Sequence, residues 1–125
     1  MSALPNISEA EWEVMRVLWD RKSPITAQEI IEALAGRKDW SPRTIKTLLN
    51  RLVKKSALGF EEEGKRYRYW AKASQEQCMR SESRSFLQRV FDGRPGPMLN
   101  YFVSNAKLSA EEIAELKKIL SKKEK

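Results

Sequence analysis

The strongest constraint on the fold is a helix-start pattern that recurs along the chain. A Ser or Thr is followed three residues later by Glu or Gln, and apolar residues flank most of these pairs. The hydroxyl caps N–H groups in the first turn and the carboxylate or amide bonds back, while a proline suits the first helical position. One such match means little, but a repeat in step with apolar periodicity predicts helix starts. The starts are Ser8, Thr26, Ser74 and Ser109, which have the full pair, and Ser41, which has Thr44 at the third position but Pro42 at the first helical position.

The stretch between the third and fourth helix starts has a different period. Residues 58–63 and 66–71 are short runs rich in Tyr, Phe and Trp, joined at Gly64-Lys65, which is typical of a β-hairpin. The Pro- and Gly-rich residues 94–97 are expected to break the helix before them. The predicted helices span residues 9–20, 27–35, 42–55, 75–91, 98–105 and 110–122.

This order of elements predicts a fold class that is mainly α with a small β-sheet. Helix, short extended piece, helix, turn, helix and hairpin follow one another, and the extended piece around Ile25 is expected to pair with the hairpin. That is the order of a winged helix-turn-helix. We therefore expect a winged helix-turn-helix domain over residues 1–73 and a three-helix dimerisation arm over residues 74–125.

The composition excludes several classes of function. There is no histidine and Cys78 is the single cysteine, which excludes Ser-His-Asp and Cys-His catalysis, an internal disulfide and a Cys/His zinc site. No apolar run is long enough to span a membrane, and the N-terminus lacks the features of a secretory signal. We expect a cytoplasmic protein that is not an enzyme, with no cofactor, no metal and no direct membrane binding. Cys78 is expected to be a small core or surface residue.

The net charge favours a polyanionic partner. There are 24 Lys and Arg against 17 Asp and Glu, a formal charge of +7. Seven of these cations and a single acid, Asp39, lie in residues 37–58. Within that stretch one helical face is apolar and the opposite face is basic and free of acids. An ordinary solvated helix mixes both signs, so a one-signed face indicates a surface that phosphates neutralise. A merely amphipathic, solvated helix is the alternative.

Side-chain chemistry divides the expected DNA contacts into two sets. Arg and Lys pair with guanine, Asn with adenine and the Thr methyl with thymine, whereas other contacts go to the backbone. The predicted base-reading residues are Arg43, Lys46, Thr47 and Asn50. The predicted backbone contacts are Thr26, Ser41, Thr44, Arg51, Lys54, Lys55, Lys65, Arg66, Tyr67 and Arg68. A solvated hairpin whose tyrosines pack on the core is the alternative for the wing, and the acidic residues 61–63 favour it.

The C-terminal arm carries more apolar side chains than three short helices easily bury. The arm either folds back on the winged helix or pairs with a second copy, and a twofold dimer also fits an operator with two half-sites. The predicted dimerisation residues are Phe86, Leu87, Val90, Phe91, Leu99, Phe102, Ile113, Leu116 and Leu120.

Three segments together resemble the penicillinase-repressor family, the BlaI/MecI repressors, with CopY-like copper repressors as cousins. They are residues 7–19, 40–55 and 66–71, and the likeness is strong over residues 7–73. It implies a homodimeric repressor on palindromic operators of bacterial resistance genes, with double-stranded DNA and a second copy as partners. It also implies that a membrane sensor-protease system triggers cleavage in the C-terminal arm and ends repression.

The resemblance places the cut at an Asn-Phe pair in a short helix. The matching residues here are Asn100, Tyr101 and Phe102, with the tyrosine between the other two. The copper branch carries a C-terminal cysteine motif that this chain lacks, which disfavours metal sensing. The competing functional interpretation is a winged-helix module that binds a protein partner and no DNA.

Overall fold

The computed structural model describes residues 6–124. By its internal contacts it divides into two compact units, Met1–Glu82 and Ser83–Lys125, which are described separately. The elements are α1 (Glu9–Asp20), β1 (Ile25–Thr26), α2 (Ala27–Leu34), α3 (Pro42–Lys54), β2 (Leu58–Glu63), β3 (Arg66–Ala71), α4 (Gln75–Phe91), α5 (Pro95–Asn105) and α6 (Ala110–Lys123). The unit boundary falls within α4, and a domain boundary between residues 73 and 74 stays a prediction.

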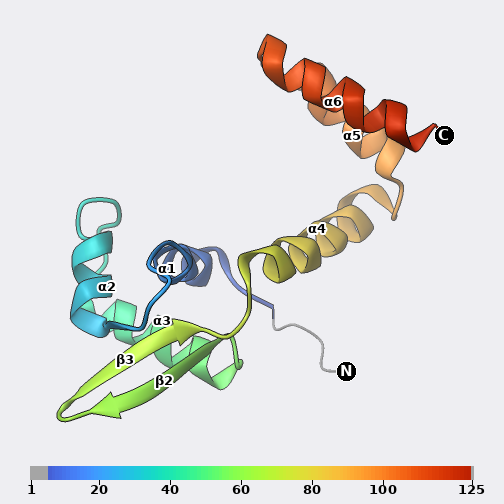
Figure 1. The fold of residues 1–125 in the computed structure, drawn as a ribbon. Helices are drawn as coiled ribbons and strands as arrows, with labels where there is room; N and C mark the ends of the chain where they lie inside the picture. Colours follow the sequence, from blue (N-terminus) through green and yellow to red (C-terminus); the bar gives the residue numbers. More distant parts are fainter. Residues whose placement is uncertain (1–5, 125) are drawn as a thin grey trace. The chain divides into compact units, whose positions relative to one another are not determined.

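The N-terminal unit is a winged helix-turn-helix, which confirms the predicted fold class. Helices α1, α2 and α3 pack together, and a three-stranded antiparallel sheet in the order β1-β3-β2 lies beside them (Figure 1). The short strand β1 pairs with β3 as expected, with Ile25 opposite Tyr69. Gly64 makes the hairpin turn with φ of 66°, a conformation that glycine adopts at little cost.

The helix-start prediction is confirmed at every capping position. Ser8, Thr26 and Ser109 each form a complete capping box with the Glu three residues later. Ser74 and Gln77 exchange the same two bonds, at 3.0 and 3.1 Å. At the start of α3 the Ser41 hydroxyl accepts a hydrogen bond from the amide of Thr44 at 3.2 Å.

The start of α5 was predicted three residues too late. The helix begins at Pro95, so the Pro-Gly-Pro run that was expected to break the chain forms its first turn instead. Proline is tolerated there because the N–H that it lacks has no partner in the first turn, and its fixed φ suits a helix. Helix α4 does end before this run, at Phe91, as predicted; the error was to place residues 95–97 outside the next helix.

A contiguous core holds the N-terminal unit together. The apolar faces of the first three helices converge with the base of the hairpin, and the side chains there are at most 9% exposed. Trp19 donates its indole N–H to the carbonyl of Ala73 at 2.9 Å, and Cys78 on α4 belongs to the same core. Cys78 is therefore a small core residue, one of its two expected placements, and burial raises the pKa of its thiol.

The C-terminal unit has no comparable core. Among residues 83–124 no side chain falls in the buried class. Phe86 and Phe91 lie 6.0 and 6.3 Å from Phe102 between ring centroids, which is the main aromatic contact of this unit. Between residues 6 and 124, no helix is both long and apolar enough to cross a membrane. The same residues contain no group of three or more side chains suited to holding a metal ion.

Candidate nucleic-acid interface

Helix α3 presents one face to the core and the opposite face to solvent. Ile45, Leu48, Leu49 and Leu52 are at most 4% exposed and fix the rotation of the helix about its axis. The four predicted base-reading residues consequently lie together on the outer face, all of them exposed. They are Arg43, Lys46, Thr47 and Asn50.

The hydroxyl groups on this face are held by the helix itself. The Thr47 hydroxyl donates to the carbonyl of Arg43 at 3.0 Å, and the hydroxyls of Ser41 and Thr44 share a hydrogen bond at 3.1 Å. Thr47 therefore has its methyl group left for an outside contact, which suits an apolar contact to a thymine methyl. No acidic residue lies in the first turn, where the helix dipole already favours anions.

Within residues 6–124 the cations of α3 and its C-cap have no internal ion-pair partner, with one exception. In the part of the chain that the structure describes, Arg43, Lys46, Arg51 and Lys54 have no carboxylate within the 4.0 Å of an ion pair. All four side chains are exposed. They form an uncompensated positive surface along the length of the helix, and this surface can accept phosphates without first breaking an ion pair.

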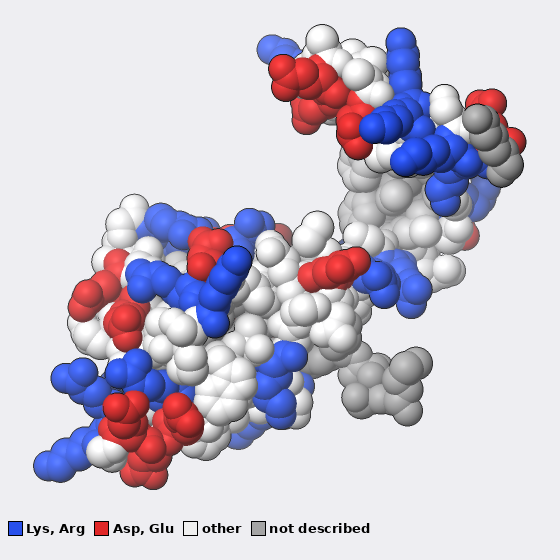
Figure 2. All heavy atoms as spheres, viewed as in Figure 1, with Lys and Arg blue, Asp and Glu red and all other residues white. Residues whose placement is uncertain are grey.

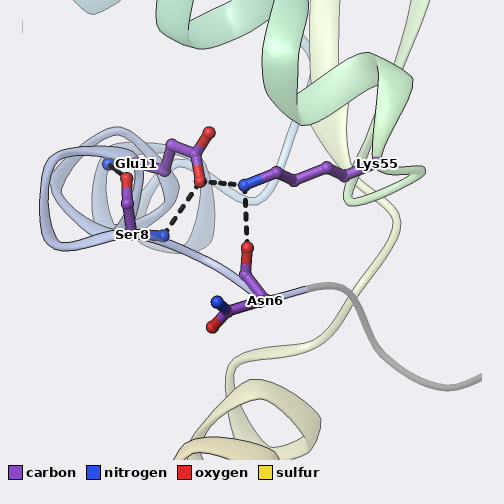
Figure 3. A network of polar contacts seen from close by, with 4 residues as sticks. All are labelled: Asn6, Ser8, Glu11 and Lys55. Carbon is purple, nitrogen blue, oxygen red and sulfur yellow. Dashed lines mark hydrogen bonds and ion pairs between the residues drawn. The ribbon is translucent and has the colours of Figure 1, made fainter.

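Lys55, at the C-cap of α3, is the exception. Its ammonium lies 2.5 Å from Oε1 of Glu11 and donates to the carbonyl of Asn6 at 2.7 Å (Figure 3). Burial of Glu11 raises the pKa of its carboxyl, but the bonds from Lys55 and Ser8 outweigh this and leave the pKa lowered overall. Lys55 is thus engaged inside the protein, which does not favour its predicted contact with phosphate.

The wing mixes both signs of charge. Strand register places Arg68 opposite Glu61 and Arg66 opposite Glu63, and Arg68 Nε lies 2.5 Å from Glu63 Oε2. Figure 2 shows acidic and basic side chains side by side at the end of the hairpin. The charge of Arg68 is therefore already neutralised by Glu63. Lys65 at the turn is exposed and has no acidic partner among the described residues.

Phe60 and Tyr67 form an exposed aromatic pair on the wing, of which only Tyr67 was a predicted contact. Phe60 and Tyr67 are 50% and 45% exposed, and their rings meet edge to face with centroids 5.6 Å apart. Tyr69 is more enclosed, and its burial raises the pKa of its hydroxyl. The Tyr67 hydroxyl thus belongs to an exposed aromatic surface, and the alternation of aromatic residues along the hairpin was the signal for it.

Thr26 lies away from the surface. Its side chain is 6% exposed, its hydroxyl accepts from the Glu29 amide at 3.2 Å and it donates to Glu29 Oε1 at 3.1 Å. The bond that the Thr26 amide donates to the Glu29 carboxylate, followed by the one from the Thr26 hydroxyl, lowers the pKa of Glu29. The hydroxyl of Thr26 fixes the start of α2, and this placement does not favour its predicted backbone contact.

The predicted dimerisation and cleavage residues all lie in the C-terminal unit and leave much apolar surface in solvent. Val90, Leu99, Phe102 and Leu120 are between 45% and 55% exposed. Tyr101, in the predicted cleavage segment, is 59% exposed and lies within α5. The remaining predicted dimerisation residues are Phe86, Leu87, Phe91, Ile113 and Leu116, of which Ile113 is exposed and the others are half-buried.

Comparison with known proteins gives one consistent family. The family model described as penicillinase repressor matches residues 7–122. The penicillinase repressor of Bacillus licheniformis is 42% identical over 120 residues, which cover 96% of this chain and 93% of the relative. The methicillin resistance regulatory protein MecI of Staphylococcus aureus (strain N315) is 38% identical over 117 residues, with 94% of each chain covered.

The similarity extends to a solved complex. The solution structure of the Bacillus licheniformis BlaI monomeric form in complex with the blaP half-operator is 42% identical and superposes with a TM-score of 0.53. The match covers 62% of this chain and 93% of that one. It therefore concerns the winged-helix part of the chain.

Proposed function

Because this chain belongs to the penicillinase repressor family, we propose that it represses transcription by binding operator DNA through α3. The observation that carries this proposal is the outer face of α3. Arg43, Lys46 and Asn50 are exposed there beside Thr47, and among residues 6–124 no carboxylate forms an ion pair with the two cations. A helix about 20 Å long fits the major groove, and these side chains match the donors and acceptors of base edges.

Backbone contacts surround the reading face in this proposal. Ser41 and Thr44 lie at the N-terminal end of α3, and Arg51 and Lys54 lie toward its C-terminal end. On the wing, Lys65, Arg66 and Tyr67 are exposed and suited to the sugar-phosphate chain. The solved complex of the related BlaI monomeric form with the blaP half-operator supports binding to operator DNA.

The functional unit in this proposal is a homodimer on a palindromic operator. The exposed apolar side chains of α4, α5 and α6 favour it, because a second copy of the C-terminal unit would cover them. Two winged helices related by a twofold axis then meet two half-sites. The regulated operon belongs, in this proposal, to bacterial resistance genes, and the protein acts in the cytoplasm.

Release from DNA is proposed to follow cleavage in α5 by a membrane sensor-protease system. Leu99, Tyr101 and Phe102 are 46%, 59% and 45% exposed, so a protease that locally unwinds this helix meets accessible side chains. A cut near Asn100 would divide the C-terminal unit, weaken the dimer and lower operator affinity. Intact mass of the protein before and after induction tests this: a chain that stays full length while the gene is expressed rules cleavage out.

Selection from a random pool tests DNA binding without a known operator. Purified protein is equilibrated with random duplexes, and retained DNA is sequenced and titrated at several salt concentrations. We expect an inverted repeat and an affinity that falls steeply with salt, because bound phosphates release counterions. No enriched sequence at low salt, together with salt-insensitive binding to a protein, would instead support the protein-interaction module.

A further inference from the structure

We propose that Glu11 and Lys55 are positioning residues for DNA recognition: their ion pair, whose carboxylate is buried, sets the orientation of α3 without touching DNA. The inference rests on the proposed function, and adds to it a pair outside the reading face. In the sequence Lys55 looks like one more phosphate contact beside Lys54. The structure separates the two, because Lys54 is exposed and unpaired among the described residues whereas Lys55 points to α1.

One carboxylate oxygen of Glu11 accepts hydrogen bonds from two segments of the chain. Oε1 of Glu11 accepts from the amide of Ser8 at 2.9 Å and from Nζ of Lys55 at 2.5 Å, and Lys55 also donates to the carbonyl of Asn6 at 2.7 Å (Figure 3). Glu11 belongs to α1, Ser8 is its N-cap, and Lys55 is the C-cap of α3. The end of α3 is therefore tied to the start of α1.

Burial of the Glu11 carboxylate distinguishes this ion pair from the surface ion pairs of the chain. The side chain of Glu11 is 2% exposed and that of Lys55 is 34% exposed, whereas Arg16 and Glu13 are 52% and 24% exposed in theirs. An exposed pair contributes little, but loss of one partner from a buried pair leaves an uncompensated charge. Glu11 without Lys55 must either draw in water or move, and both loosen the contact between α1 and α3.

A small rotation of α3 about its C-terminal end displaces its N-terminal end by a larger distance. The helix has 13 residues and is about 20 Å long. A rotation of about 10° about its last turn displaces its first turn by about 3 Å, more than a hydrogen bond tolerates. Base contacts from Arg43 and Lys46 would be lost, while phosphate contacts, which depend on charge more than on direction, would persist.

Charge and positioning predict opposite effects for Glu11→Gln. Removing a carboxylate raises the net positive charge, so long-range attraction alone strengthens binding to every DNA. Loss of positioning instead weakens binding to the selected duplex and leaves binding to scrambled DNA little changed. The ratio of the two affinities therefore reports on orientation, and the slope of affinity against salt reports on phosphate contacts.

The experiment compares Glu11→Gln and Lys55→Met with the matched control Lys54→Met, on the selected inverted repeat and on a scrambled duplex. For Lys54→Met we expect weaker binding to both duplexes and a salt slope smaller by about one. For Glu11→Gln and Lys55→Met we expect about tenfold weaker binding to the inverted repeat, an unchanged slope and scrambled-duplex affinity within about twofold. Lys55→Arg, which keeps the cation, should restore most of the ratio.

Two results would overturn the proposal. One is a Glu11→Gln protein that is folded at the assay temperature and binds the inverted repeat at least as tightly as the unaltered chain. The other is a Lys55→Met protein whose salt slope falls as it does for Lys54→Met. If the unaltered chain retains no DNA at all, the proposed function fails instead.

A measurement on the unaltered protein keeps the test valid if these variants unfold. The ¹⁵Nζ resonances of Lys54 and Lys55 are recorded by NMR without DNA and with the selected duplex. We expect the Lys54 signal to shift on binding and the Lys55 signal to stay, because its ammonium remains on Glu11. A Lys55 signal that shifts as much as that of Lys54 places the ammonium on phosphate and contradicts the proposal.

Discussion

At the scale of single residues, Glu11 gives the protein a specific response to acid. Its folded-state pKa lies below the ordinary value of 4.5, since the bonds from Lys55 and Ser8 outweigh its burial. A lowered folded pKa contributes stability above the unfolded pKa, and this contribution is lost as the pH falls through the folded pKa. The ion pair therefore contributes fully to the stability of the fold at neutral pH, and its contribution declines as the pH falls below about 4.5 toward the lower folded pKa.

Urea unfolding of the unaltered chain and Glu11→Gln at pH 7 and pH 3.5 measures this. We expect the variant to be less stable at pH 7, by about 1–2 kcal/mol, because a neutral amide weakens the bonds that the carboxylate accepts from Lys55 and Ser8. The difference should narrow at pH 3.5. Glu9→Gln, an exposed change on the same helix, should cost less at pH 7. A difference that is the same at both pH values would contradict the assignment.

Asn50 tests base reading by a neutral residue. Its amide is exposed on the outer face of α3 and carries no charge, so Asn50→Ala leaves the electrostatic contribution unchanged. We expect a loss of about 1–3 kcal/mol of discrimination at one base pair, with an unaltered salt slope. Titration against duplexes changed at single positions checks this; equal discrimination at every position would show that Asn50 does not read a base.

The exposure of side chains on α3 was predictable from sequence, because it depends on helix rotation alone. The apolar stripe of Ile45, Leu48 and Leu52 fixes which side chains are exposed, and this needs no knowledge of other elements. Lys54 and Lys55 could not be told apart in this way, because their difference depends on Glu11, which lies 44 residues away. Arg68 and Glu63 are a similar case, since the pairing follows from strand register.

At the scale of elements, start signals were predictable because they are local. A capping hydroxyl and its partner lie only three residues apart, so the pair predicts a helix start from the sequence of a single turn. This holds for Ser8, Thr26, Ser74 and Ser109. The start of α5 was missed because Pro95 was treated as a stop signal rather than as a first-turn residue. Proline breaks a helix in its interior but is favoured in its first turn, so its position relative to the helix decides its effect.

The hairpin base depends on a glycine that leaves space for an indole. A Cβ placed on Gly59 would lie 2.6 Å from the ring of Trp70, which stands opposite it in the neighbouring strand. We expect Gly59→Ala to destabilise the protein by about 1–3 kcal/mol, because the indole must move. At Gly36 nothing lies within 4 Å of a Cβ, which makes Gly36→Ala the matched control.

Thermal unfolding of both variants measures this effect. We expect a clearly lower Tm for Gly59→Ala and little change for Gly36→Ala. Equal Tm values for Gly59→Ala and the unaltered chain would show that Trp70 relaxes at no cost, and would argue against a tightly packed hairpin base.

At the scale of the whole molecule, the C-terminal unit is proposed to join two copies. Leu120 is 55% exposed on α6, and Ser121 beside it is exposed as well. We expect Leu120→Glu to shift the protein from dimer to monomer in sedimentation equilibrium, because it places a charge in an apolar contact. Ser121→Glu should leave the dimer intact. A Leu120→Glu protein that stays dimeric would place the contact elsewhere.

Assembly was the least predictable level. The apolar side chains of residues 83–124 could be identified from the sequence. Whether they pack on the winged helix or on a second copy depends on the shapes of both surfaces, which periodicity does not give. The division of the chain inside α4 could not be predicted either. Nothing in the local sequence around Cys78 indicates that this residue packs in the N-terminal core. Periodicity reports the face that a residue occupies, not the partner of that face.

The most direct test of the central claim is the affinity ratio of a triple variant, Lys46→Ala, Thr47→Ala and Asn50→Ala. Binding to the selected inverted repeat and to a scrambled duplex is titrated by fluorescence anisotropy at one salt concentration. If α3 reads the operator, the ratio falls close to one, while scrambled-duplex affinity drops only as far as the loss of one cation requires. A ratio that matches that of the unaltered chain would show that another element reads the sequence.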